Sequence, residues 1–215
     1  MGDEFRRRYI GNVSTRVLSD VVRGQISFWL FTATCVALHP GFVLGADEGG
    51  MSNYGTHLKT FVPYTLALGA TALYSLRAAG RLGSQPESRG LAWALRNYAT
   101  FLLLVLASTY VYSLNRGWRD VHFTLAIALA LVEVIGAAEI VLTMGRERRD
   151  LLFLVVQWIG VVLLVLTGFF GVHVLFLTQV AMAAGFGGLV VSASRQLSSP
   201  ARASVVTMRP PTTSS

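Results

Sequence analysis

The chain has 215 residues, of which 53% are hydrophobic and only 13% are charged, and its formal net charge is +7. A mean hydropathy of +0.55 excludes an ordinary water-soluble domain and indicates a protein that is solvated by lipid. A basic protein of this size could bind nucleic acid, but its charges cluster between apolar runs, as in membrane proteins. We therefore expect no nucleic-acid partner.

Residues 1–25 are predicted to be cytoplasmic and to include an interfacial helix. In the stretch NVSTRVLSDVVRG, apolar residues recur at helical spacing, while Arg16, Asp20 and Arg23 fall elsewhere on the turn. Such a helix can lie flat on the inner leaflet, with its arginines near anionic lipid headgroups.

Six apolar runs follow, and each is long enough to cross a hydrocarbon core of ~30 Å. They cover roughly residues 26–45, 61–79, 91–114, 121–144, 151–170 and 172–192. Backbone polar groups find no partner in lipid, so runs of this length must be helical, and the alternation typical of barrel strands is absent from the sequence. The fold class predicted is an all-α integral membrane bundle of six transmembrane helices, with the transmembrane domain at 26–192.

The basic residues predict the orientation of this bundle. With six spans, every Lys and Arg except Lys59, Arg116 and Arg119 falls on one side. The positive-inside rule then places the N- and C-termini in the cytoplasm, and we expect a multi-pass protein of the cell (plasma) membrane. The tail at 193–215 is rich in Ser, Thr and Pro and is predicted to be disordered in the cytoplasm.

The first outer loop carries short motifs, which read HPGF, GGMSNYGTH and FVPYTLALGA. Over about residues 25–80 the chain resembles the DRAM/Sfk-type six-span membrane proteins and their uncharacterised bacterial relatives. In that family a proline ends the first helix and a Ser-Asp/Asn-x-Gly turn follows; Pro40, Ser52, Asn53 and Gly55 match these places, although the family more often has Asp where Asn53 stands. The resemblance implies a non-enzymatic membrane protein, linked in eukaryotic members to lipid organisation or membrane trafficking.

Two glutamates interrupt the fourth apolar run. If the hairpin of the third and fourth spans is centred near residue 117 or 118, Arg96 lies level with Glu139, because both helices rise ~1.5 Å per residue. An unpaired carboxylate there would be costly, so we expect an Arg96–Glu139 ion pair near the cytoplasmic end. The alternative is that each side chain reaches the inner headgroups separately.

Glu133 lies near the middle of its span, about 18 Å from either end, too deep to reach water. Small residues share its helix face, so it is expected to look into the bundle, where a neutral carboxyl group is favoured. The same arithmetic places Gln179 level with Glu133, as its partner, and Gln157 level with Glu139. Glu133 is then either a functional ionisable group or part of a structural hydrogen bond.

The predicted outer face gathers the histidines and several other polar side chains. These outer candidates are His39, His57, His122, His173, Asp47, Glu48, Ser52 and Asn53. Histidines with carboxylates suit zinc or a pH-sensitive cluster, but the spacing matches no known ligand motif, so a metal site stays undetermined. No phosphate-binding loop, cysteine pair or nucleophile-elbow pattern occurs in the sequence, and no cofactor is expected.

These observations favour a membrane protein without classical enzyme machinery, acting as an accessory or lipid-interacting component. Its expected partners are membrane lipids, with a membrane-protein partner or a second copy of the chain also open. The alternative is a small transporter or proton-coupled channel that uses Glu133, and a less favoured class is a membrane-embedded metal hydrolase that uses the outer histidines.

Overall fold

The computed structural model describes residues 3–44, 50–83, 88–112, 114–144, 148–171 and 174–199, and their side chains from residue 13 onward except that of residue 44. These residues form helices and turns, without a strand among them. The helices are α1 (Asp3–Leu38), α2 (Gly41–Leu44), α3 (Ser52–Thr56), α4 (Phe61–Leu82), α5 (Arg89–Thr109), α6 (Arg116–Met144), α7 (Arg148–Phe170) and α8 (Leu175–Ser198). The all-α fold class is confirmed.

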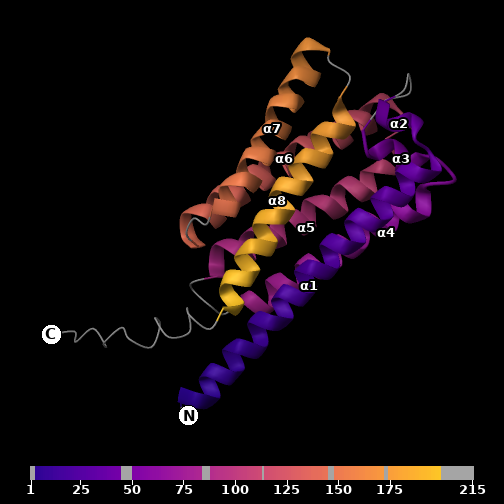
Figure 1. Ribbon diagram of the computed structural model, residues 1–215. Helices are drawn as coiled ribbons and strands as arrows, with labels where there is room; N and C mark the ends of the chain where they lie inside the picture. The colour runs from indigo at the N-terminus through magenta and orange to yellow at the C-terminus, as the bar shows by residue number, and fades with distance from the viewer. Residues whose placement is uncertain are drawn as a thin grey trace.

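The six long helices run up and down along one bundle (Figure 1). α1 begins and α8 ends at the same end, which we call the basic end, because arginines of α4, α5, α7 and α8 gather there. These are Arg81, Arg89, Arg148, Arg149 and Arg195. The short helices α2 and α3 lie at the opposite end, which we call the α3 end.

Five of the long helices are long and apolar enough to cross a membrane, namely α1 from Val13 onward, α5, α6, α7 and α8. α4 has 22 residues and does not belong to this set. Its buried face includes several small and polar residues, and one of them, Thr71, donates to the backbone carbonyl of Gly24 on α1 at 3.2 Å. α4 lies between α1 and α5 and makes most of its contacts with these two helices.

The N-terminal segment differs from the prediction. α1 is a single helix through residue 38, so the stretch predicted as a separate interfacial helix continues directly into the first span. Val17 is fully buried and Val21 is 4% exposed, and Asp20 forms an ion pair with Arg81 of α4. The polar residues that suggested contact with headgroups therefore include one that binds a neighbouring helix.

α8 lies against α1, α6 and α7, and its glycines allow these close contacts. A Cβ atom on Gly185 would lie 2.6 Å from the backbone N of Gln157, and one on Gly188 would lie 2.3 Å from the ring of Phe153. On another face, Gly187 contacts Gln25 of α1. α8 also extends to Ser198, beyond the predicted boundary at 192, and most of the predicted tail lies outside the described residues.

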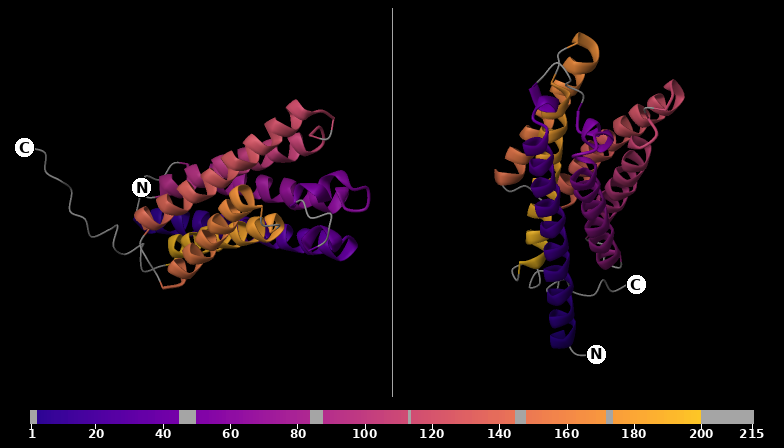
Figure 2. Two further views of the ribbon diagram at one scale, coloured as in Figure 1. Left: turned by 90° about the horizontal axis from the view of Figure 1, so that it is seen from above. Right: turned by 90° about the vertical axis from the view of Figure 1, so that its right-hand side faces the viewer.

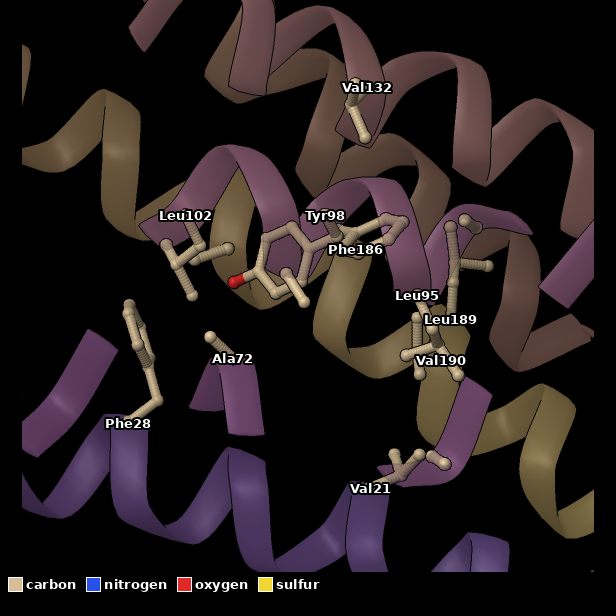
Figure 3. Packing of buried hydrophobic residues seen from close by; sticks show 14 of the residues in the cluster. Val21, Phe28, Ala72, Leu95, Tyr98, Leu102, Val132, Phe186, Leu189 and Val190 are labelled. Carbon is tan, nitrogen blue, oxygen red and sulfur yellow. The ribbon is translucent and has the colours of Figure 1, made fainter. Parts of the chain in front are cut away.

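The centre of the core lies between α5 and α8 (Figure 3). The rings of Tyr98 and Phe186 pack there with centroids 4.9 Å apart, above Leu95 and Leu189. The hydroxyl group of Tyr98 points away from this layer, toward the side on which Leu102 lies.

α5 and α6 form a hairpin that leans away from α1 and α8 toward the α3 end (Figure 2). Within the hairpin the helices stay close, because Gly136 of α6 lies against Ala94 of α5, and Gly90 against Thr143. By contrast, α6 and α7 make few contacts with each other. The α5–α6 hairpin therefore separates from α1 and α8 toward the α3 end, and a cavity lies between them there.

Candidate functional site

A cavity of about 350 Å³ occupies the opening between α5, α6 and α8, below α3. Its walls are mostly apolar, and most of them come from α5, α6 and α8, with smaller parts from α1, α4 and α7. The side chains that line it include Leu102, Val105, Ala126, Leu129, Ala130, Met182 and Ala183. Polar groups gather where the cavity meets α3, and these are Ser52, Asn53, Tyr112, His122 and Gln179. The site therefore has a polar end and an apolar body.

His122 is the centre of the polar end. It is 4% exposed, and its Nε2 atom lies 2.8 Å from the hydroxyl oxygen of Ser52, while its Nδ1 atom lies 2.8 Å from that of Ser108. The Ser108 hydroxyl donates to the backbone carbonyl of Val105 at 2.9 Å. Because that bond uses the Ser108 proton, Nδ1 carries the ring proton and donates to Ser108, which leaves Nε2 to accept from Ser52.

The hairpin geometry explains why these groups meet. Ser108 lies in the last turn of α5 and His122 in the second turn of α6, so the short turn between the helices brings them level. The ring of Tyr112, in that turn, stacks on His122 with centroids 5.1 Å apart, and its hydroxyl donates to Asn53 at 3.2 Å. The segment that begins α3 is therefore held over the cavity by the α5–α6 hairpin.

Gln179 of α8 holds the same segment from the other side. Its Oε1 atom accepts a hydrogen bond of 2.6 Å from the backbone N–H of Met51. Gly50, just before, has a φ of 74°, and a Cβ there would lie 2.9 Å from that Oε1 atom, so the position requires glycine. The predicted hydrogen bond between Gln179 and Glu133 is therefore replaced by one to the backbone just before α3.

Glu133 lies on the cavity wall and is only 6% exposed, as expected for a residue that faces into the bundle. Its carboxyl group makes no hydrogen bond or ion pair within the described part of the chain. Phe186 packs against Gly136, so Ala183, rather than Gln179, is level with Glu133. Gln179 lies about one turn, ~6 Å, nearer to the α3 end.

The predicted Arg96–Glu139 ion pair is wrong. Both side chains are exposed, the carboxylate of Glu139 lies beside Gly90, and the guanidinium group of Arg96 lies beside Gly83 at the end of α4. The reason is the register of the hairpin: its centre lies nearer residue 115 than 117 or 118, so residues of α5 and α6 are level about five positions from where the arithmetic placed them. An ion pair is instead formed by Asp20 of α1 and Arg81 of α4.

Gln157 is buried between α7 and α8 at 2% exposure. Neither atom of its amide has a hydrogen-bond partner among the described residues. It borders a crevice between α6 and α7, with Ala137, Val141 and Trp158 on the walls. Gln157 of α7 therefore lies at about the same height along the bundle as Glu139 of α6, as predicted. It borders the face of α6 that carries Ala137 and Val141, whereas Glu139 lies on another face.

The outer histidines separate into two places. The rings of His39 and His57 contact each other near the end of α1, with centroids 4.4 Å apart, and the buried phenol of Tyr54 donates to the carbonyl of His39. Burial raises the pKa of Tyr54 to about 12. Three or more His, Cys, Asp or Glu side chains do not come together as a metal site in the described ranges, and the candidates His173, Asp47 and Glu48 lie outside those ranges.

Residue-level prediction from sequence missed Ser108, Tyr98 and Tyr112. Ser108 is followed by Thr109 at the end of an apolar run, and a hydroxyl pair in such a place is a usable signal for a polar contact with the next helix. Tyr98 borders the cavity beside Glu133 and carries no distinguishing sequence pattern.

Comparison with protein-family models, with curated proteins and with solved structures gave no match. The function must therefore be argued from the site itself. A pocket with one polar end and an apolar body can hold an amphipathic molecule, with hydrogen bonds fixing its polar group and apolar walls covering the rest.

Proposed function

We propose that this chain is a six-span protein of the cell membrane that binds an amphipathic lipid in the cavity below α3, with both termini in the cytoplasm. α4 would be the sixth span, because α1 and α5 both begin at the basic end and the chain must return between them. The concentration of arginines at that end supports a cytoplasmic orientation.

Lipid binding rests on one observation, the separation of polar and apolar surface within the cavity. A headgroup at the α3 end would meet Ser52, Asn53 and Gln179, and an acyl chain would lie along Leu102 and Met182. The cavity also reaches the outer surface of the bundle, because Ile127 and Phe123 on its wall are 58% and 51% exposed. A lipid could then enter sideways from the bilayer, between α6 and its neighbours α7 and α8.

The test is the lipid that remains bound after mild detergent extraction, measured by mass spectrometry per mole of protein. Ala130→Phe places a ring in the cavity and should reduce the retained lipid about tenfold, equivalent to ~1.4 kcal/mol. The matched control is Ala107→Phe on the exposed face of α5, which should retain the wild-type amount. Equal retention in the two variants would contradict lipid binding in this cavity.

The orientation has its own test, which uses single cysteines in a Cys35→Ala background. A cysteine at Lys59 should react with a membrane-impermeant maleimide on intact cells, and one at Gly83 should react only after permeabilisation. Labelling of Gly83→Cys on intact cells would reverse the orientation.

Glu133 favours a second candidate function, proton-coupled transport through the same cavity. Its carboxyl group is buried, borders the cavity and has no partner in the described part of the chain, which is typical of an ionisable group that exchanges a proton. Proton flux into liposomes should then fall to background in Glu133→Gln. Equal flux in wild type and variant would exclude this candidate.

A further inference from the structure

The polar end of the cavity contains more than a headgroup site requires. Ser52, His122 and Ser108 form one line of hydrogen bonds, with both contacts to the ring at 2.8 Å. In serine hydrolases a hydroxyl group donates to a histidine, and a third group bonded to the other ring nitrogen fixes the tautomer. Here Ser108 is in the place of that third group, because its own proton is committed to the carbonyl of Val105.

We propose that Ser52 and His122 are the nucleophile and general base of a hydrolase site that cleaves a lipid ester held in the cavity. This inference rests on the proposed function, since the lipid bound in the cavity is the substrate. The chain brings the pair together from segments 70 positions apart, and both residues line the cavity.

The chemistry is complete with water as the second substrate. The Oγ atom of Ser52 attacks the ester carbonyl carbon while Nε2 of His122 takes the hydroxyl proton. The bond to the alcohol oxygen then breaks, and His122 returns the proton to that oxygen, which releases the alcohol. Water attacks the acyl-Ser52 ester in the same way, so that the carboxylic acid leaves and Ser52 regains its proton.

The surroundings of the pair suit this reaction. His122 is nearly excluded from solvent, and Tyr112 covers one face of its ring, so the imidazole is held in one orientation. Gln179 accepts from Met51, the residue before Ser52, through its amide oxygen. Its NH₂ group has no partner among the described residues and is the donor available to the carbonyl oxygen of a bound ester.

The cavity shape indicates the class of ester. Glu133 is eleven residues from His122 along α6, or ~16 Å, and mostly apolar side chains line the wall between them. An acyl chain can lie along this wall with its carbonyl group at Ser52. We therefore expect long-chain esters to be cleaved faster than acetate esters.

The experiment uses the purified full-length chain in detergent and two probes, a fluorophosphonate with a long alkyl chain and p-nitrophenyl esters of different acyl lengths. Mass spectrometry should locate the label on Ser52. Ester cleavage should fall at least about 100-fold in Ser52→Ala and in His122→Gln. The matched control is Thr56→Ala, which removes a hydroxyl from the same short helix; within the described residues this hydroxyl bonds only to the backbone carbonyl of Asn53. The activity of this variant should stay unchanged.

Ser108 is a positioning residue, and its variants separate catalysis from folding. Ser108→Ala should lower kcat about tenfold or more with KM nearly unchanged, and Ser108→Thr should restore part of kcat. The labelling of the wild-type chain needs no variant, so it decides the question even if Ser52→Ala does not fold.

Three outcomes would overturn the proposal, and they separate it from lipid binding. If the wild-type chain retains lipid but neither reacts with the probe nor cleaves esters, the protein binds lipid and is not a hydrolase. Label on a residue other than Ser52 excludes this nucleophile. Cleavage of acetate esters alone, without retained lipid, contradicts both the lipid substrate and the proposed function.

Discussion

Buried polar groups have different roles at the two ends of the bundle. At the basic end, most join neighbouring helices directly: Asp20 bonds to Arg81 of α4, and Asp150 accepts from Ser192 and Gln196 of α8. At the α3 end, polar groups instead border a cavity, and several hold a loop above it. The comparison indicates that the basic end stabilises the bundle, while the α3 end provides a place for a ligand.

The largest expected effect comes from the helix contact of α8 with α7. Gly185→Ala should lower stability by about 3 kcal/mol, because its Cβ would lie 2.6 Å from the backbone of Gln157 and the helices must move apart. Gly168→Ala on α7 is the control, since nothing lies within 4 Å of its Cβ position. Thermal unfolding in detergent measures both. Equal midpoints would show that this packing is looser than described.

A double-mutant cycle tests the ion pair at the basic end. Asp20→Asn and Arg81→Gln should show a coupling energy of about 1 kcal/mol, because the carboxylate is buried and the guanidinium group is partly exposed. The same cycle on Arg96 and Glu139 should give a coupling below about 0.3 kcal/mol. A larger coupling energy between Arg96 and Glu139 than between Asp20 and Arg81 would support the ion pair that was predicted from the sequence.

Gln157 is an exception among the buried polar groups between α7 and α8, since its amide has no partner among the described residues. Gln157→Leu should therefore raise the free energy of unfolding by about 1 kcal/mol. Gln196→Leu should lower it, because the amide of Gln196 donates to Asp150 at 3.1 Å. If Gln157→Leu also destabilised the chain, the amide of Gln157 would have to bind a water, a lipid or another molecule.

The smallest effect is expected at the inner part of the cavity. Glu133→Gln should change the free energy of unfolding by less than about 0.5 kcal/mol, because the substitution keeps the shape and removes no hydrogen bond within the described part of the chain. A loss above about 1.5 kcal/mol would mean that the carboxylate has a charged partner, and the contrast between the two ends would weaken.

Sequence reasoning predicted the helices well because lipid allows few alternatives. The predicted runs at 121–144 and 151–170 correspond to α6 and α7, and Glu133 faces the interior as its small neighbours indicated. In the last span, small residues are typical of close helix packing, and Gly185 and Gly188 do contact α7.

Predictions that depended on register or on a partner failed or were incomplete. The depth of each residue was predicted by counting residues from the middle of each turn, which assumes straight helices. In the structure the register differs by a few residues, so Arg96 is not level with Glu139 and Gln179 is not level with Glu133. The polar face of α1 looked like an interfacial helix because one helix alone does not reveal that Asp20 meets Arg81.

The Ser52–His122 contact could not be found by spacing. The two residues come from a short helix in a glycine-rich loop and from α6, and no local pattern links them. Their meeting depends on Tyr112 and Gln179, which hold the loop from two sides. Sequence analysis could place both residues on the same face of the membrane but not in contact.

The most direct test of the account is an experimental structure of the chain in lipid nanodiscs. We predict elongated density between α5, α6 and α8, with its polar end beside Ser52 and His122 and its apolar part along Leu102 and Met182. A cavity closed by side chains, or one filled by separate waters along its whole length, would contradict a lipid-binding site.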